Sequence, residues 1–134
     1  MPSRICSSEK LKHVLTTVLN GSVEDIELTI ANYFSPRYMQ TTDGHESDHA
    51  HFREHLLKLR SILRSAQVEV LFFISDGSKI ADRHVVTVEK LDGNRMTIEV
   101  LLLGHCDGDG RLVEVWETTR QVDGKEDGSN LGRI

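Results

Sequence analysis

The second half of this chain alternates apolar and polar residues over a long run that only short, glycine-containing turns interrupt. The run begins at Gln67, and three turns divide it: Asp76-Gly77-Ser78, Asp92-Gly93-Asn94 and Asp107-Gly108-Asp109-Gly110. Alternation with a period of two is typical of β-strands, and turns rich in Asp, Asn and Gly join antiparallel neighbours. We therefore expect strands at 67–75, 79–90, 95–106 and 111–122, forming an antiparallel meander. Strands this long twist, so the sheet should curl.

The first half has the three-and-four spacing of amphipathic helices. A first helix has Ser7 or Ser8 as its cap and ends at Asn20-Gly21, and its apolar stripe is Leu11, Val14, Leu15, Val18 and Leu19. A second helix starts at Ser22 to Asp25, carries Ile26, Ile30, Tyr33 and Phe34, and ends at Ser35-Pro36. After a short extended segment at 37–41 and a turn at Asp43-Gly44, Asp48 caps a third helix with Phe52, Leu56, Leu59 and Leu63 on its apolar stripe.

Length and charge narrow the classes of protein that fit. A chain of 134 residues is one ordinary domain, which we place at 1–122, followed by an acidic, loosely ordered tail at 123–134. The formal charge of −5 lacks the positive excess that nucleic-acid binding requires. The longest apolar stretches, around 70–74 and 100–103, are strand-sized and far below the roughly 20 residues that span a bilayer, so no membrane association is expected.

The remaining compositional signals point to a cytoplasmic protein without a cofactor. The N-terminus has no apolar segment or cleavage site of the secretory kind. Cys6 and Cys106 have no metal-binding or redox spacing, and we interpret both as reduced structural thiols. The chain also lacks a glycine-rich phosphate loop and a dinucleotide fingerprint, so we expect no nucleotide cofactor.

The order helix, helix, short strand, helix and four hairpin-linked strands resembles a known superfamily. The segment Tyr33-Phe34-Ser35-Pro36-Arg37-Tyr38-Met39-Gln40 is similar to the tyrosine-rich segment of SnoaL-like domains, and Asp109-Gly110-Arg111-Leu112-Val113-Glu114-Val115-Trp116 is similar to their turn into the last strand. Glu126-Asp127 with Leu131-Gly132 resembles the acidic tail of an uncharacterised bacterial subgroup. The resemblance is to the nuclear-transport-factor-2-like (NTF2-like) superfamily, which includes SnoaL-like polyketide cyclases and ketosteroid isomerases.

This resemblance implies an α+β cone, in which three N-terminal helices pack on a curved, mainly antiparallel sheet and enclose a pocket. If the strand register follows the isomerase-like members, strand parity selects the inward side chains. On the last strand they are Val113, Val115, Glu117 and Thr119, and on the strand before it Val100, Leu102, Gly104 and Cys106. On the strand at 79–90 they are Ile80, Asp82, His84 and Val86. A slip of one residue would reverse the whole assignment.

Glu117 and His84 are the candidate catalytic residues, with Tyr38 and Asp82 at the rim of the pocket. A carboxyl group in an apolar cavity has a raised pKa, which suits it to exchange a proton near neutral pH with a nearby imidazole. The alternative is that Glu117 and His84 hydrogen-bond each other and only satisfy two buried polar groups. The remaining predicted ligand-binding residues are Val100, Leu102, Val115 and Thr119.

The catalytic set of the ketosteroid isomerases is absent. Those enzymes place a tyrosine and a protonated aspartic acid opposite an aspartate base. At the matching positions this chain has Val14, Leu102, and Gln40 or Thr41, none of which performs those roles. Steroid isomerisation is therefore not expected.

Two other features suggest metal binding but favour simpler interpretations. His45, His49, His51 and His55 cluster before and within the third helix, and the last two have the spacing of helical zinc ligands. No third ligand is fixed by spacing, and we interpret the cluster as a solvated helix start. The run 107–110 resembles the opening of a calcium loop but lacks the rest of the ligand pattern, so it is a hairpin turn. We predict no metal site.

The outward face of the sheet carries Leu112, Glu114, Trp116 and Arg120, a combination typical of a partner surface. The resemblance implies a homodimer through this face. Three hypotheses follow for function: an enzyme that moves a proton on a hydrophobic carbonyl compound, a non-catalytic binder of a small hydrophobic molecule, and an interaction module that acts through the outer sheet face.

Overall fold

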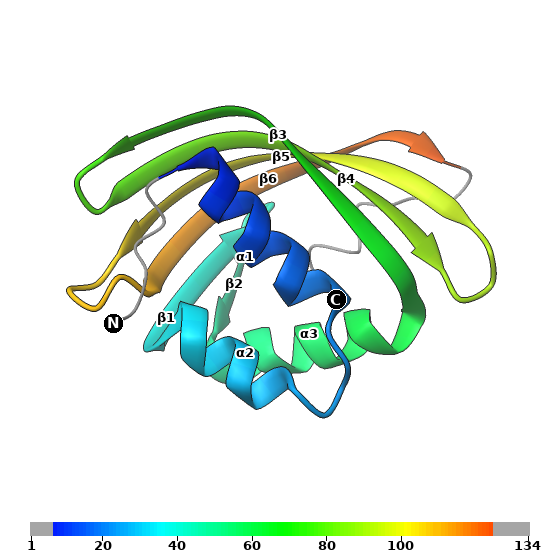
Figure 1. Ribbon diagram of the computed structural model, residues 1–134, viewed down its shortest axis with the longest axis horizontal. Coiled ribbons are helices and arrows are strands. Elements are labelled where there is room, and N and C mark those ends of the chain that lie inside the picture. Colours follow the sequence, from blue (N-terminus) through cyan, green and yellow to red (C-terminus); the bar gives the residue numbers. More distant parts are fainter. Residues whose placement is uncertain (1–6, 125–134) are drawn as a thin grey trace.

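The computed structural model describes residues 7–124, which form a curved sheet with three helices on its concave side (Figure 1). The elements are α1 (Ser8–Asn20), α2 (Ile26–Tyr33), β1 (Phe34–Thr42), β2 (His45–Asp48), α3 (His49–Ile62), β3 (Leu63–Asp76), β4 (Lys79–Lys90), β5 (Arg95–Cys106) and β6 (Leu112–Gly124). The strand order is β2-β1-β6-β5-β4-β3. Every neighbouring pair is antiparallel except β1 and β6, which run parallel. Within the described range, no helix is long and apolar enough to cross a membrane.

The expected α+β architecture and the meander are confirmed. Strands β4 and β5 have the predicted bounds, and α1 starts after Ser7, whose hydroxyl accepts a hydrogen bond from the Lys10 amide at 3.1 Å. The third helix, however, follows β1 and β2 in the chain, so only α1 and α2 precede the sheet.

The predicted helix ends were wrong in two places. Phe34, Ser35 and Pro36 belong to β1 rather than to the end of α2, and Leu63 starts β3 rather than ending α3. In both cases the backbone becomes extended directly after the last helical hydrogen bond, in which Phe34 N donates to Ile30 O and Leu63 N to Leu59 O. The side chains of Phe34 and Leu63 stay buried, so the apolar spacing of each helix continues through them although the backbone does not.

The edges of the sheet also differ from the prediction. The short strand β2 was not predicted, and it pairs with the end of β1 through the turn at Asp43-Gly44. Strand β6 runs to Gly124, two residues past the expected domain boundary, because 123–124 pair with β5. Cys6 and positions 125–134 of the predicted tail lie outside the described residues.

A register shift at the start of β6 changes one inward assignment. The pairing with β5 is regular from Leu102↔Glu117 to His105↔Glu114 and then jumps to Cys106↔Leu112. Val113 is therefore left out of the alternation, and Leu112, which we expected on the outer face, is buried instead. Such a bulge is not visible in the sequence pattern, because Leu112 and Val113 are both apolar.

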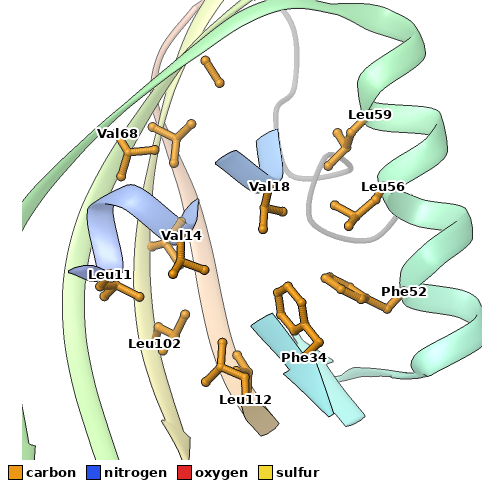
Figure 2. Close-up of a cluster of buried hydrophobic side chains, with 14 of the residues drawn as sticks. Leu11, Val14, Val18, Phe34, Phe52, Leu56, Leu59, Val68, Leu102 and Leu112 are labelled. Atoms are coloured by element: carbon orange, nitrogen blue, oxygen red, sulfur yellow. The ribbon is translucent and has the colours of Figure 1, made fainter. Parts of the chain in front are cut away.

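The core fills the space between the concave face of the sheet, α1 and α3. Figure 2 shows Leu11, Val14 and Val18 of α1 between the sheet and the side chains of α3. Phe34, Tyr38 and Phe52 form an aromatic cluster with ring centroids 4.6 to 4.8 Å apart. Tilted and edge-on contacts of this kind add about 0.5 to 1.5 kcal/mol per pair beyond burial. The cluster fixes the Tyr38 ring between β1 and α3.

A buried arginine from α3 terminates α1. The fully buried side chain of Arg60 donates hydrogen bonds to the backbone oxygens of Thr17, Val18 and Ser22, at 3.0, 3.0 and 2.6 Å, and pairs with Asp25. The last turn of α1 has no basic residue of its own, so Arg60 supplies the positive charge that a helix C-terminus favours. Gly21 belongs to this arrangement, because a Cβ there would lie 2.5 Å from the guanidinium.

Arg60→Met should lower the free energy of unfolding by about 3 kcal/mol, because it leaves three backbone oxygens and Asp25 without their cation. Urea denaturation measures this loss. The matched control is Arg53→Met on the same helix, which removes only an exposed ion pair with Glu27 and should cost less than about 1 kcal/mol. Equal losses in the two variants would show that Arg60 does not hold α1 in place.

Candidate functional site

A cavity of about 140 Å³ lies between the concave face of the sheet, α1 and α3. Most of its wall is apolar, and Val100, Leu102 and Val115 contribute to it. Its polar side chains are Tyr38, Gln40, His55, His84, Glu117 and Thr119. No lysine or arginine is among the described residues that line it. The cavity therefore suits a small, largely apolar molecule with one polar end.

His84 and Asp82 form a buried pair on β4. Their side chains are 4% and 0% exposed, and His84 Nδ1 lies 2.8 Å from Asp82 Oδ2. An ionised carboxylate can only accept, so Nδ1 carries the hydrogen and Nε2 is left for a ligand. Asp82 Oδ1 has no partner among the described residues. This pairing fixes the orientation and tautomer of the imidazole.

Glu117 is joined to Tyr38 by a chain of hydrogen bonds along one face of β1. The Tyr38 hydroxyl donates to Gln40 Oε1 at 2.8 Å, and Gln40 Nε2 donates to Thr42 Oγ1 at 2.9 Å. Thr42 Oγ1 in turn donates to Glu117 Oε1 at 2.9 Å. The three β1 residues are two apart, so their side chains share a face, and the parallel register sets Thr42 beside Glu117.

The turn after β1 holds this arrangement against β6. The Asp43 carboxylate accepts from both the backbone amide and the hydroxyl of Thr119, and the Asp43 amide donates to Glu117 O at 2.9 Å. Asp43 and Gly44 have φ values of 49° and 84°, a left-handed pair that lets two residues reverse the chain into β2. Thr119 thus lines the cavity, but its hydroxyl is used to anchor the turn.

Burial dominates the electrostatics of Glu117 and raises the pKa of its carboxyl above the ordinary value. The hydrogen bond from Thr42 and the charge of His84 act in the opposite direction, while the negative charges of Asp43 and Asp82 raise it further. Burial, with a smaller contribution from the charge of Glu117, also raises the pKa of Tyr38 well above its usual range. The phenol therefore stays protonated and the carboxyl is poised to exchange a proton.

The structure brings the predicted site residues onto one surface, with two corrections. Across the strands, Asp82, Leu102 and Glu117 form one inward row, and His84, Val100 and Thr119 form the next. Tyr38 and Asp82, however, are 2% and 4% exposed, so they are buried rather than at the rim.

Glu117 and His84 do not hydrogen-bond each other, so the alternative prediction of a direct bond between them is wrong. Glu117 is hydrogen-bonded to Thr42 instead, and His84 to Asp82. Each of the two candidate groups therefore has its own positioning partner. Each also keeps one polar atom, Glu117 Oε2 or His84 Nε2, for which the described residues provide no hydrogen bond.

Three residues at the site were not predicted to belong to it. Gln40 and Thr42 complete the chain to Glu117, and His55 lines the cavity from α3. The alternation of polar residues at 38, 40 and 42, on a strand that ends in a turn, was the available signal. The sequence pattern groups His55 with the histidines that precede it. In the structure His55 lines the cavity, whereas the Nδ1 atom of His51 lies 2.7 Å from Oδ1 of the capping residue Asp48. Nowhere in residues 7–124 do three or more metal-ligating side chains gather.

Comparison by sequence gives one distant relative. No protein-family model matches the chain. An uncharacterized protein of Schizosaccharomyces pombe is 26% identical over 110 residues, which cover 82% of this chain and 83% of the relative.

Comparison by structure identifies the architecture. An NTF2-like protein of unknown function from an Exiguobacterium species superposes with a TM-score of 0.66 at 12% identity, covering 81% of this chain and 93% of that one. This chain has the NTF2-like fold. Other structural neighbours are a proposed polyketide cyclase from Acidithiobacillus ferrooxidans (TM-score 0.60, 20% identity, 87% and 91% covered) and an LEH-like epoxide hydrolase of M. tuberculosis (0.63, 13%, 81% and 78%).

The raised pKa of Glu117 predicts a pH-dependent effect of Glu117→Gln. A carboxyl whose pKa is higher in the folded state than in the unfolded state stabilises the fold at low pH and loses that contribution as pH rises through the raised pKa. Relative to wild type, Glu117→Gln should therefore gain stability between about pH 4 and about pH 7, as measured by urea denaturation.

Glu99→Gln is the control with the opposite sign. Hydrogen bonds from Arg83 and Arg120 lower the pKa of Glu99, so its contribution is present at neutral pH and is lost as pH falls. Relative to wild type, this variant should therefore lose stability as pH rises through the acidic range to about pH 5, at lower pH than the gain of Glu117→Gln. If Glu117→Gln lost stability relative to wild type as pH rises, as Glu99→Gln should, burial would not raise the pKa of Glu117.

Proposed function

We propose that this chain is a SnoaL-like enzyme that binds a small hydrophobic carbonyl compound in the cavity and moves a proton on it. The observation that carries the proposal is the convergence of two separately positioned groups, Glu117 and His84, on one apolar cavity. The polyketide cyclase and epoxide hydrolase among its neighbours support chemistry inside this fold, and the substrate has to be argued from the site itself.

The two groups have complementary roles. Glu117 Oε2 is the base, because Oε1 is held by Thr42 and burial raises the carboxyl pKa toward neutrality. His84 is oriented by Asp82 at Nδ1, and its Nε2 is the hydrogen-bond donor to the carbonyl oxygen when both ring nitrogens carry a hydrogen. Glu117 takes a proton from the carbon next to the carbonyl, the C–H electron pair becomes the enolate π bond, and the carbonyl π pair moves onto the oxygen. In an isomerisation, the proton returns to another carbon of the conjugated system. In a cyclisation, the enolate carbon bonds to a second carbonyl carbon of the same molecule, whose π pair moves onto its oxygen and takes the proton from Glu117.

This arrangement differs from that of the ketosteroid isomerases in the source of the electrophile. Leu102 stands at the place where those enzymes use a protonated aspartic acid, and it separates Asp82 from Glu117 in the inward row. His84 supplies the donor from the neighbouring row instead. The cavity of about 140 Å³ also favours a compound of one or two rings over a steroid.

Hydrogen–deuterium exchange at carbon tests the proposal without knowledge of the physiological substrate. Wild-type protein in D₂O should accelerate exchange of the protons next to the carbonyl in members of a panel of small cyclic and aromatic ketones, followed by NMR. Glu117→Gln should reduce this exchange at least about 100-fold, the usual effect of losing a general base. Glu114→Gln, on the same strand but at the outer face, is the matched control and should keep the wild-type rate.

Two results would contradict the proposal. Exchange that Glu117→Gln retains would assign the proton transfer to another group. A wild-type protein that exchanges no ketone faster than buffer would leave the cavity as a binding site without this chemistry.

We further propose that the chain forms a homodimer through the outer face of the sheet. Leu101, Leu103 and Trp116 are 51%, 58% and 43% exposed on β5 and β6, and Phe72 and Ile74 extend this apolar surface onto β3. Monomeric proteins rarely expose a continuous apolar surface of this kind. Charged side chains of both signs, such as Glu99 with Arg83 and Arg120, lie beside it, which suits pairing with a second copy.

Leu103→Lys should convert the dimer into a monomer of 15.1 kDa, because it places a charge in the middle of the apolar face. Light scattering during size-exclusion chromatography gives the mass. Leu28→Lys is the matched control, since Leu28 is 66% exposed on α2, away from the sheet, and its substitution should leave the dimer intact. A wild-type monomer would disprove the dimer.

A further inference from the structure

The chain from Tyr38 to Glu117 has a direction, and both of its ends line the same cavity. Thr42 accepts from Gln40, so its single hydroxyl hydrogen is free to donate to Glu117. Gln40 accepts from Tyr38 through its oxygen, so the phenol hydrogen points into the chain and away from the cavity. Every hydrogen bond thus runs toward the carboxylate, which is the order that an anionic Glu117 requires.

A neutral Glu117 permits the reverse order on the same heavy atoms. After half a rotation of the carboxyl group, the hydroxyl that formed at Oε2 lies where Oε1 was and donates to Thr42. The Thr42 hydroxyl then donates to Gln40, and Gln40 donates to the Tyr38 oxygen after its amide also turns by half a rotation. The amide oxygen and nitrogen are close in size, so the three distances of 2.8, 2.9 and 2.9 Å serve both orders. No proton crosses the amide. The net changes are that the proton of Glu117 turns toward Thr42 and that the Tyr38 hydroxyl hydrogen is released.

We propose that this chain couples the two ends of the site, so that Tyr38 turns its O–H toward the cavity only when Glu117 holds a proton. The inference rests on the proposed function and extends it. When Glu117 has taken the substrate proton, the substrate oxygen carries negative charge, and Tyr38 then supplies a second hydrogen-bond donor beside His84. The donor is present in the intermediate and absent in the ground state, which is the difference that accelerates a reaction.

Gln40 is the positioning residue in this coupling. It is 7% exposed and lies between Tyr38 and Thr42, and its amide has to turn before the chain can run in the reverse direction. The titratable groups around Glu117 are Asp82 and His84 on β4, Asp43 in the β1–β2 turn and Tyr38 on β1, with His55 of α3 on the same cavity. Among these titratable groups, only Tyr38 is connected to Glu117 by the hydrogen bonds of Gln40 and Thr42.

NMR of the free protein tests the coupling. The chain has two tyrosines, so Tyr38 labelled with ¹³C at Cζ is assigned by comparison with Tyr33→Phe. On titration through the acidic and neutral range, the Tyr38 signal should shift with a midpoint equal to that of the Glu117 carboxyl carbon, observed in the same sample. A Tyr38 signal that does not follow Glu117 would overturn the proposal.

Thr42 offers a matched pair of variants that separates the chain from electrostatic effects through space. Thr42→Val keeps the shape but removes the hydroxyl, so the Tyr38 shift should be lost while Glu117 still titrates. Thr42→Ser keeps the hydroxyl and should keep the shift. A full shift in Thr42→Val would mean that the charge of Glu117 or His84 acts directly, and would overturn the coupling. Gln40→Met, which should also lose the shift, repeats the test if Thr42→Val does not fold.

The outcome is independent of the exchange experiment with ketones. A Tyr38 signal that follows Glu117 in a protein without exchange activity would keep the coupling and remove the proposed reaction. Exchange activity that needs Glu117, together with a Tyr38 signal that does not follow Glu117, would keep the proposed reaction and remove the coupling.

Discussion

The parallel pairing of β1 with β6 is the constraint on which the rest of the site depends. It is the one parallel pair among the strands of residues 7–124, and it joins a strand from the first half of the chain to the last strand of the meander. Its register sets Thr42 beside Glu117, and the turn at Asp43 fixes that register through two hydrogen bonds to Thr119. A shift by one residue would turn the polar face of β1 away from the cavity and leave Glu117 without its donor.

The concave face of the sheet buries more polar groups than a purely structural core requires. Asp82, His84, Gln40 and Thr42 are nearly inaccessible, and each has a partner within the same face. Burying such groups costs free energy even when they are hydrogen-bonded, and an apolar inner face would fold as well or better. The aromatic cluster around Phe52 stabilises the fold and also positions Tyr38 in the cavity wall, whereas Arg60 stabilises the end of α1 outside the cavity lining. Polar groups retained on an inner face at such a cost are expected of a site that is maintained for function.

Several features could be predicted from the sequence because they depend on neighbouring residues. Alternation with a period of two and the Asp-Gly turns gave the bounds of β4 and β5, and Ser7 and Asp48 gave the starts of α1 and α3. The predictions failed where an apolar residue fits two structures equally well. Phe34 and Leu63 complete a helical stripe and also start a buried strand, and Leu112 and Val113 exchange roles at a bulge.

The sequence by itself determined the strands and turns of the meander and which residues of β4 and β5 share a face, because strand parity is a local property. The resemblance to the NTF2-like superfamily implied that the face with Asp82 and His84 is the inner one, and the structure places both residues there. Only the tertiary structure decided which partner each polar group has. Tyr38, Gln40 and Thr42 could be read as one face of a strand, but that face meets Glu117 because residues 75 positions apart pair across β1 and β6. Arg60 reaches the end of α1 for the same reason, since its carbonyl partners lie up to 43 positions away. Contacts at such separations follow from packing the whole sheet against its helices, and no local pattern specifies them.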